Sequence, residues 1–248
     1  MHVERYGAGS EVYLGLHGWG GDHRMFAPIA ARLPSSASLY SADLPGCGQS
    51  PAPKDWEVGT IVEEIIAAIE TIAADPIVLI GSCSGANLAL LVARKLRSRI
   101  ARLVLIDIFA FMPRYFRLFT NKNFGRYAYY SAFANPLGRW VGNQSLRGHR
   151  TAETDLTNSF VSVDHKVSYH YLLMLSQIKG LEQFRDLTMP IDIAYGERTF
   201  GAVKRSAAQW RALWPHAREW ELQGAGHLPI EEATTQLCQV IFGKKENS

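Results

Sequence analysis

Short apolar segments, most of them rich in branched residues, alternate along the chain with longer segments of helical periodicity. The short segments are bounded by Gly, Pro or Asp and are predicted to be strands at 12–18, 38–43, 76–81, 102–107, 191–196 and 218–224. Helices are predicted at 58–74, 85–96, 200–214 and 229–242. This order is typical of an α/β fold with a mostly parallel sheet and helices on both faces. Ligands bind such sheets beyond the carboxyl ends of the strands, so we examine the residues that follow each strand first.

One long stretch, from about residue 109 to 187, lacks a convincing strand and is rich in aromatic residues. We interpret it as a helical cap inserted into one domain that spans 1–248, because a chain of this length can bury a single large core. Aromatic residues on helices either pack against one another or line a substrate pocket, and both remain open here. A cap inserted at the carboxyl edge of the sheet would cover the site.

Composition restricts the partners and the location of the protein. A net charge of +3 does not suggest nucleic-acid binding, and no apolar run is long enough to cross a membrane. No signal peptide is visible at the N-terminus, so a cytoplasmic location is expected. The three cysteines, Cys47, Cys83 and Cys238, are expected to be free thiols, since no pair has the spacing of metal ligands.

Basic residues gather in the predicted cap. Between residues 114 and 150 there are seven of them and no acidic residue: Arg114, Arg117, Lys122, Arg126, Arg139, Arg147 and Arg150. Such a run is most often a solvated surface. The alternative is a contact surface for a phosphate group, as in coenzyme A, or for an acidic carrier protein.

The stretch LIGSCSGANLAL, residues 79–90, joins a predicted strand to a predicted helix. A nucleophile elbow needs small residues two positions before and after the nucleophile, because the tight turn brings those backbones together. Gly81 and Gly85 occupy these positions around Cys83. A second register centres on Ser84, between Ser82 and Ala86, but glycine suits the crowded positions better. We therefore predict Cys83 as the nucleophile.

Two further loops carry residues that suit acyl chemistry. His227 lies in a glycine-rich loop after the last predicted strand, the setting expected of a general base, and it follows the nucleophile along the chain. After the first predicted strand comes His17-Gly-Trp-Gly-Gly-Asp22, whose glycines allow a tight turn that can direct an amide N–H toward a developing negative charge.

The ordered motifs HGWGGD, DLPGCGQS, GSCSGA and GAGH make the chain resemble the α/β-hydrolases over nearly its whole length. The first two are similar to those of carboxylesterases that cleave methyl esters from acyl chains on carrier proteins. The resemblance implies an oxyanion hole formed by the backbone N–H groups of Trp19 and Ser84. It also implies a carboxylate partner for His227.

The chain departs from the family pattern in two places. Most members have serine at the elbow, although relatives such as dienelactone hydrolases and polyhydroxyalkanoate synthases use cysteine, whose thioester can pass an acyl group to water or to another acceptor. The turn that usually carries the acid has Thr199 in its place. Asp107, after the preceding strand, is the favoured acid; Glu197 is the alternative, and a site without an acid is a third possibility.

These observations predict a hydrolase that cleaves an acyl ester or thioester, with Cys83 as nucleophile, His227 as base and Asp107 as acid. No metal or organic cofactor is required. The substrate is expected to be a small-molecule or carrier-bound acyl group, bulky and apolar. The alternatives are an acyltransferase or cyclase on the same scaffold, or a binding protein that has lost catalysis.

Overall fold

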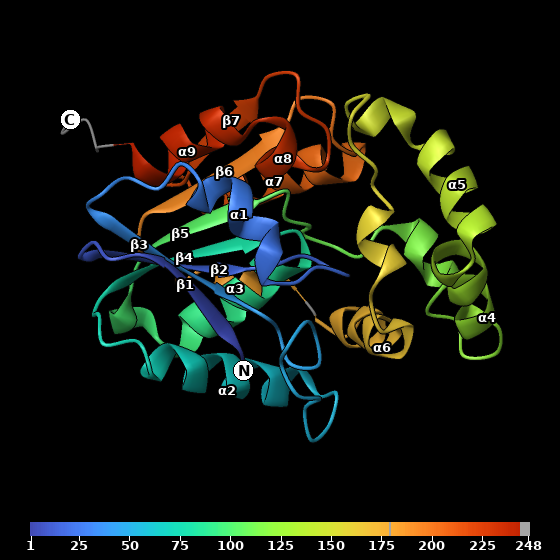
Figure 1. Ribbon diagram of the computed structural model, residues 1–248, viewed down its shortest axis with the longest axis horizontal. Coiled ribbons are helices and arrows are strands. Elements are labelled where there is room, and N and C mark those ends of the chain that lie inside the picture. The colour runs from blue at the N-terminus through green and yellow to red at the C-terminus, as the bar shows by residue number, and fades with distance from the viewer. Residues whose placement is uncertain (179, 244–248) are drawn as a thin grey trace.

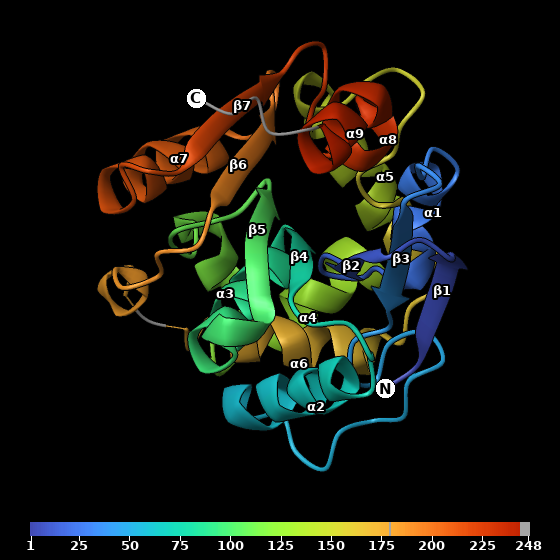
Figure 2. The same ribbon diagram turned by 90° about the vertical axis from the view of Figure 1, so that its left-hand side faces the viewer.

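The computed structural model describes residues 1–178 and 180–243. Seven strands in this part of the chain form one sheet in the order β1-β3-β2-β4-β5-β6-β7 (Figures 1 and 2). Only β1 is antiparallel to its neighbour. The strands are β1 Val3–Gly7, β2 Glu11–Leu16, β3 Ala37–Ala42, β4 Ile77–Ser82, β5 Ile100–Ile106, β6 Ile191–Gly196 and β7 Arg218–Leu222. The predicted α/β class and mostly parallel sheet are confirmed.

Helices cover both faces of this sheet (Figure 2). One face packs against α2 Val58–Glu70, α3 Ser84–Lys95 and α7 Gly201–Leu213, and the other against α1 Ala27–Ala30 and α9 Thr234–Phe242. Successive residues of β5 face opposite sides: Leu103 and Leu105 belong to one core, and Val104 and Ile106 to the other. This two-residue period explains why the central strands have continuous apolar sequences.

Two elements differ from the prediction. Strand β1 was not expected, because its sequence VERYG lies at the sheet edge, is only partly buried and lacks an apolar run. The predicted helix 229–242 is divided into α8 Pro229–Glu232 and α9, because Ala233 between them has a non-helical φ of −138°.

The segment between β5 and β6 is helical, and its described residues from 109 to 187 contain no strand. Its main helices are α4 Gly125–Tyr129, α5 Pro136–Ser145 and α6 His165–Leu175, which lie together beside the sheet (Figure 1). The Trp19 ring contacts Phe116, Tyr129, Phe133 and Phe160, so many of the aromatic residues do pack against one another. The division into one domain with a cap stays a prediction.

Within the described chain, every helix is too short or too polar to cross a bilayer.

Candidate active site

Cys83 lies at a sharp bend between β4 and α3, with φ of +51° and ψ of −114°. A side chain at either flanking glycine would clash with the backbone: a Cβ on Gly81 would lie 2.3 Å from the Ala86 Cα, and one on Gly85 would lie 2.3 Å from the Leu16 carbonyl oxygen. The strained, non-glycine residue between two obligatory glycines is therefore Cys83. Ser84 is the first residue of α3 and is buried.

His227 follows β7 and reaches toward Cys83 from the other side of the site. Its Nδ1 lies 2.6 Å from Asp107 Oδ2, and the Cys83 side chain is close enough to the ring to act on its pKa. Burial alone would lower the pKa of His227, but the hydrogen bonds and negative charges of Asp107 and Cys83 outweigh it and raise this pKa from 6.5 to about 10. The imidazolium form of His227 is thus favoured at neutral pH.

Asp107 comes directly after β5 and is almost fully buried. Its Oδ1 accepts a hydrogen bond from the Gly196 N–H at 3.1 Å, and its Oδ2 accepts one from the Thr199 hydroxyl at 2.5 Å. The Thr199 oxygen also lies 3.2 Å from His227 Nδ1. Glu197 is exposed and accepts a hydrogen bond from the Gly224 N–H, so the structure brings Asp107, and not Glu197, to the imidazole.

The sequence predicts only that Thr199 removes a negative charge from the turn where relatives usually carry their acid, and it gives no sign of a further role. In the structure Thr199 is a hydroxyl donor that holds the carboxylate of Asp107.

The loop after β2 lies against the bend at Cys83, since a Cβ on Gly18 would come within 3.2 Å of the Cys83 Cβ. In the described residues, neither the Trp19 N–H nor the Ser84 N–H donates to a protein acceptor. His17 holds this loop: its Nδ1–H donates to the Gly18 carbonyl at 2.8 Å, and its Nε2 accepts from the Leu44 N–H. Burial lowers the pKa of His17, so it stays neutral in this structural role.

A carboxylate that the sequence did not single out, Glu232, joins the His227 loop to the helical segment. It accepts hydrogen bonds from the Gly226 N–H, which precedes His227, and from the N–H of Thr151 and the hydroxyl of Thr154. The His227 N–H in turn donates to the His149 carbonyl at 2.8 Å. These bonds fix the imidazole relative to residues 149–154.

A cavity of about 90 Å³ opens at Cys83 beneath the helical segment. Most of its surface is hydrocarbon. Apart from the indoles of Trp19 and Trp210, the only polar side chains among its described lining residues are those of Cys83, Ser84 and Asn87. The apolar lining is Phe109, Ala110, Phe111, Met112, Pro113, Phe116, Leu172, Leu175, Ile178 and Phe184. Aromatic residues of the segment therefore serve both as core and as cavity wall.

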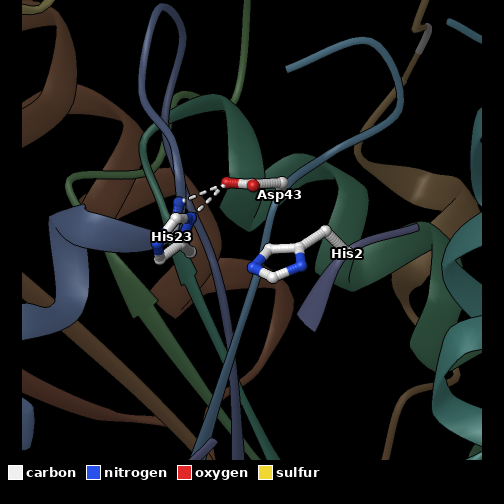
Figure 3. A group of neighbouring side chains, drawn as sticks. All are labelled: His2, His23 and Asp43. Carbon is white, nitrogen blue, oxygen red and sulfur yellow. Dashed lines mark hydrogen bonds and ion pairs between the residues drawn. The ribbon is translucent and has the colours of Figure 1, made fainter. Parts of the chain in front are cut away.

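One group of described side chains could share a metal ion: the ligand atoms of His2, His23 and Asp43 lie within 4.8 Å of one another (Figure 3). The Asp43 oxygens are already engaged, since Oδ1 accepts from the His23 N–H and lies 2.9 Å from its Nδ1, while Oδ2 accepts from the Gln49 N–H. None of the three lines the cavity at Cys83. We assign this cluster to the support of the loops after β2 and β3.

Comparison with known proteins identifies the family of the chain. Residues 14–234 match the family described as alpha/beta hydrolase fold. The chain is 31% identical over 100 residues to a pimeloyl-(acyl-carrier protein) methyl ester esterase of Neisseria meningitidis, covering 40% of this chain and only 37% of that protein. It is 25% identical to the Salmonella newport protein of the same name, over 98% of this chain and 97% of that one.

Among solved structures, a thermophilic esterase from Thermogutta terrifontis has a TM-score of 0.79 at 20% identity, over 97% of this chain and 91% of that one. At this identity the likeness concerns the fold alone. The family match, by contrast, extends over most of the chain, from β2 to the start of α9. The chain therefore belongs to the α/β-hydrolase fold family.

Proposed function

We propose that this protein hydrolyses an acyl ester or thioester through a covalent acyl-Cys83 intermediate. The observation that carries the proposal is that buried Asp107 lies 2.6 Å from the Nδ1 of His227, while Cys83, at the bend between two glycines, is close enough to the same ring to raise its pKa. The names of the relatives, which are methyl ester esterases, support ester cleavage as the reaction class.

In the first half-reaction the Cys83 thiolate attacks the acyl carbonyl carbon and a C–S bond forms. The negative charge moves to the carbonyl oxygen, where the N–H groups of Trp19 and Ser84 can donate to it. When the tetrahedral intermediate collapses, the bond to the leaving group breaks. The His227 imidazolium gives its proton to the departing alkoxide or thiolate, which leaves as an alcohol or thiol.

In the second half-reaction neutral His227 takes a proton from water as the water oxygen attacks the thioester carbonyl. The C–S bond then breaks, the carboxylic acid leaves, and the thiolate faces the imidazolium again. Asp107 stabilises the His227 imidazolium both before the first attack and again after His227 has taken a proton from water. The sum is one ester and one water converted to one acid and one alcohol.

The cavity and the basic surface suggest the kind of substrate. A hydrocarbon lining suits an apolar acyl chain. Five of the seven basic side chains between 114 and 150 are exposed, whereas Arg139 and Arg150 donate to backbone carbonyls of their own segment. The exposed five would suit an acidic carrier protein or a phosphate-bearing carrier of the acyl group.

Intact-protein mass spectrometry tests the proposal. Incubation with activated esters and thioesters should add the mass of one acyl group, and the adduct should be absent in Cys83→Ala. Ser84→Ala is the matched control, because it removes the neighbouring hydroxyl but keeps both the Cys83 thiol and the backbone N–H at position 84. An adduct that persists in Cys83→Ala, or none with any ester in the wild-type protein, would refute it.

The acyl acceptor is decided in the same experiment. If an added amine, alcohol or thiol receives the acyl group in preference to water, the protein is an acyltransferase with the same intermediate. The alternative of a binding protein without catalysis depends on Thr199 at the usual acid position. Asp107, within hydrogen-bond distance of His227, supplies the carboxylate that this alternative assumed to be lost.

A further inference from the structure

Two residues that line the Cys83 cavity carry a polar side-chain group without a hydrogen-bond partner in the described protein. The first is the indole N–H of Trp210, which is fully buried and finds no acceptor. Trp214 provides the comparison: its ring stacks on Trp210 at 4.7 Å, yet its own N–H donates to the Phe184 carbonyl at 2.9 Å. Buried donors are nearly always paired in folded proteins, so an unpaired N–H on a residue that lines a cavity requires an explanation.

The second group is the side-chain amide of Asn87. It lies in the first turn of α3, four residues after Cys83, and both residues line the cavity. It lines the cavity and makes no hydrogen bond with any described residue. An amide that can donate and accept is therefore left available inside a surface that is otherwise mostly hydrocarbon.

We propose that the cavity is built for an acyl chain that carries a second, neutral oxygen function beyond the reacting carbonyl, such as a keto, ether or ester oxygen. The Trp210 N–H donates to this oxygen, and the Asn87 amide provides a further donor. The proposal deepens the function proposed above and rests on it. A neutral oxygen fits better than a carboxylate, because none of the described lining residues carries a charge that could balance a buried anion.

The hydrocarbon lining alone would accept any chain of suitable length. An oxygen at the right position would give the buried N–H its missing acceptor, while a methylene there would leave it unpaired. Sites that donate to a substrate oxygen discriminate against the analogue that lacks it for this reason. Trp210 and Asn87 would thus determine specificity without taking part in bond cleavage.

The test uses pairs of p-nitrophenyl esters of equal chain length, in which one methylene at successive positions is replaced by an ether oxygen or a keto group. We expect kcat/KM of the wild-type protein to favour the oxygenated ester by about 10-fold at one position along the chain. Trp210→Phe should reduce this ratio to near one while the unsubstituted ester still reacts. Trp214→Phe, the matched loss of an indole N–H that already has a protein acceptor, should leave the ratio unchanged.

If Trp210→Phe does not fold, the position scan on the wild-type protein and on Asn87→Leu still tests whether the cavity prefers an oxygen along the acyl chain. A ratio near one at every position would overturn the proposal, as would a preference for a chain ending in a carboxylate. Either result leaves the proposed function intact provided that the plain esters acylate Cys83. Failure of all esters to acylate Cys83 would instead refute the function itself.

Discussion

Replacement of Asp107 by Asn tests the proposed relay most directly, because it keeps the size of the side chain and removes its charge. The Asp107 Oδ2 lies 2.6 Å from His227 Nδ1, and a charge-assisted hydrogen bond contributes roughly 1.5–3 kcal/mol. At about 1.4 kcal/mol per factor of ten, kcat/KM should fall roughly 10- to 150-fold. The same loss should lower the pKa of His227 from about 10 by roughly one to two pH units.

A second substitution, in the loop after β6, can restore a negative charge near His227 Nδ1. The Thr199 oxygen lies 3.2 Å from His227 Nδ1, and an aspartate at this position would place a carboxylate within the same reach. In the double variant Asp107→Asn/Thr199→Asp we expect at least about a tenfold recovery over Asp107→Asn alone, by the same charge-assisted bond. Thr199→Val, which keeps the shape and removes the hydroxyl, should cost about 2- to 10-fold, less than Asp107→Asn because the carboxylate charge at Nδ1 remains.

The assay is steady-state hydrolysis of an activated ester, combined with thermal unfolding to verify that each variant folds. Histidine NMR across pH would report the pKa of His227 in the same proteins. If a folded Asp107→Asn variant kept full activity, or if its His227 kept the wild-type pKa, a charge at Nδ1 would not be what the site requires. Failure of a folded double variant to recover would contradict the proximity argument for Thr199.

Three further predictions concern stability and are measured by urea unfolding. The pKa of His227 is raised on folding, so its stabilising effect should be complete below pH 6.5 and lost as the pH rises toward about 10, and His227→Asn should remove this slope. Asp192→Ala should lower the unfolding free energy by about 3–5 kcal/mol, because it leaves the buried charge of Arg102 without its carboxylate. Gly85→Ala should be strongly destabilising, whereas Gly59→Ala, which meets no atom within 4 Å, should be neutral or stabilising.

The sequence allowed the central strands and the elbow to be predicted because both depend on local constraints. Buried parallel strands need continuous apolar runs, and the bend at Cys83 needs glycine at 81 and 85, where any side chain would meet the backbone. The edge strand β1 has neither constraint, so its sequence carried no signal. Glu232 was also missed, because its partners at Thr151 and Thr154 are some eighty residues away along the chain.

Thr199 shows why the residue at one motif position can mislead: the usual acid is absent there, yet a carboxylate still reaches His227 from another strand. Strands β4, β5, β6 and β7 are parallel neighbours in the sheet, so the loops that follow them meet at one edge. The imidazole from the loop after β7 lies where side chains from the ends of both β5 and β6 can reach its Nδ1. The fold thus offers two places for one negative charge. Here the carboxylate occupies the first, and the hydroxyl at the second donates to it and so holds the charge in place.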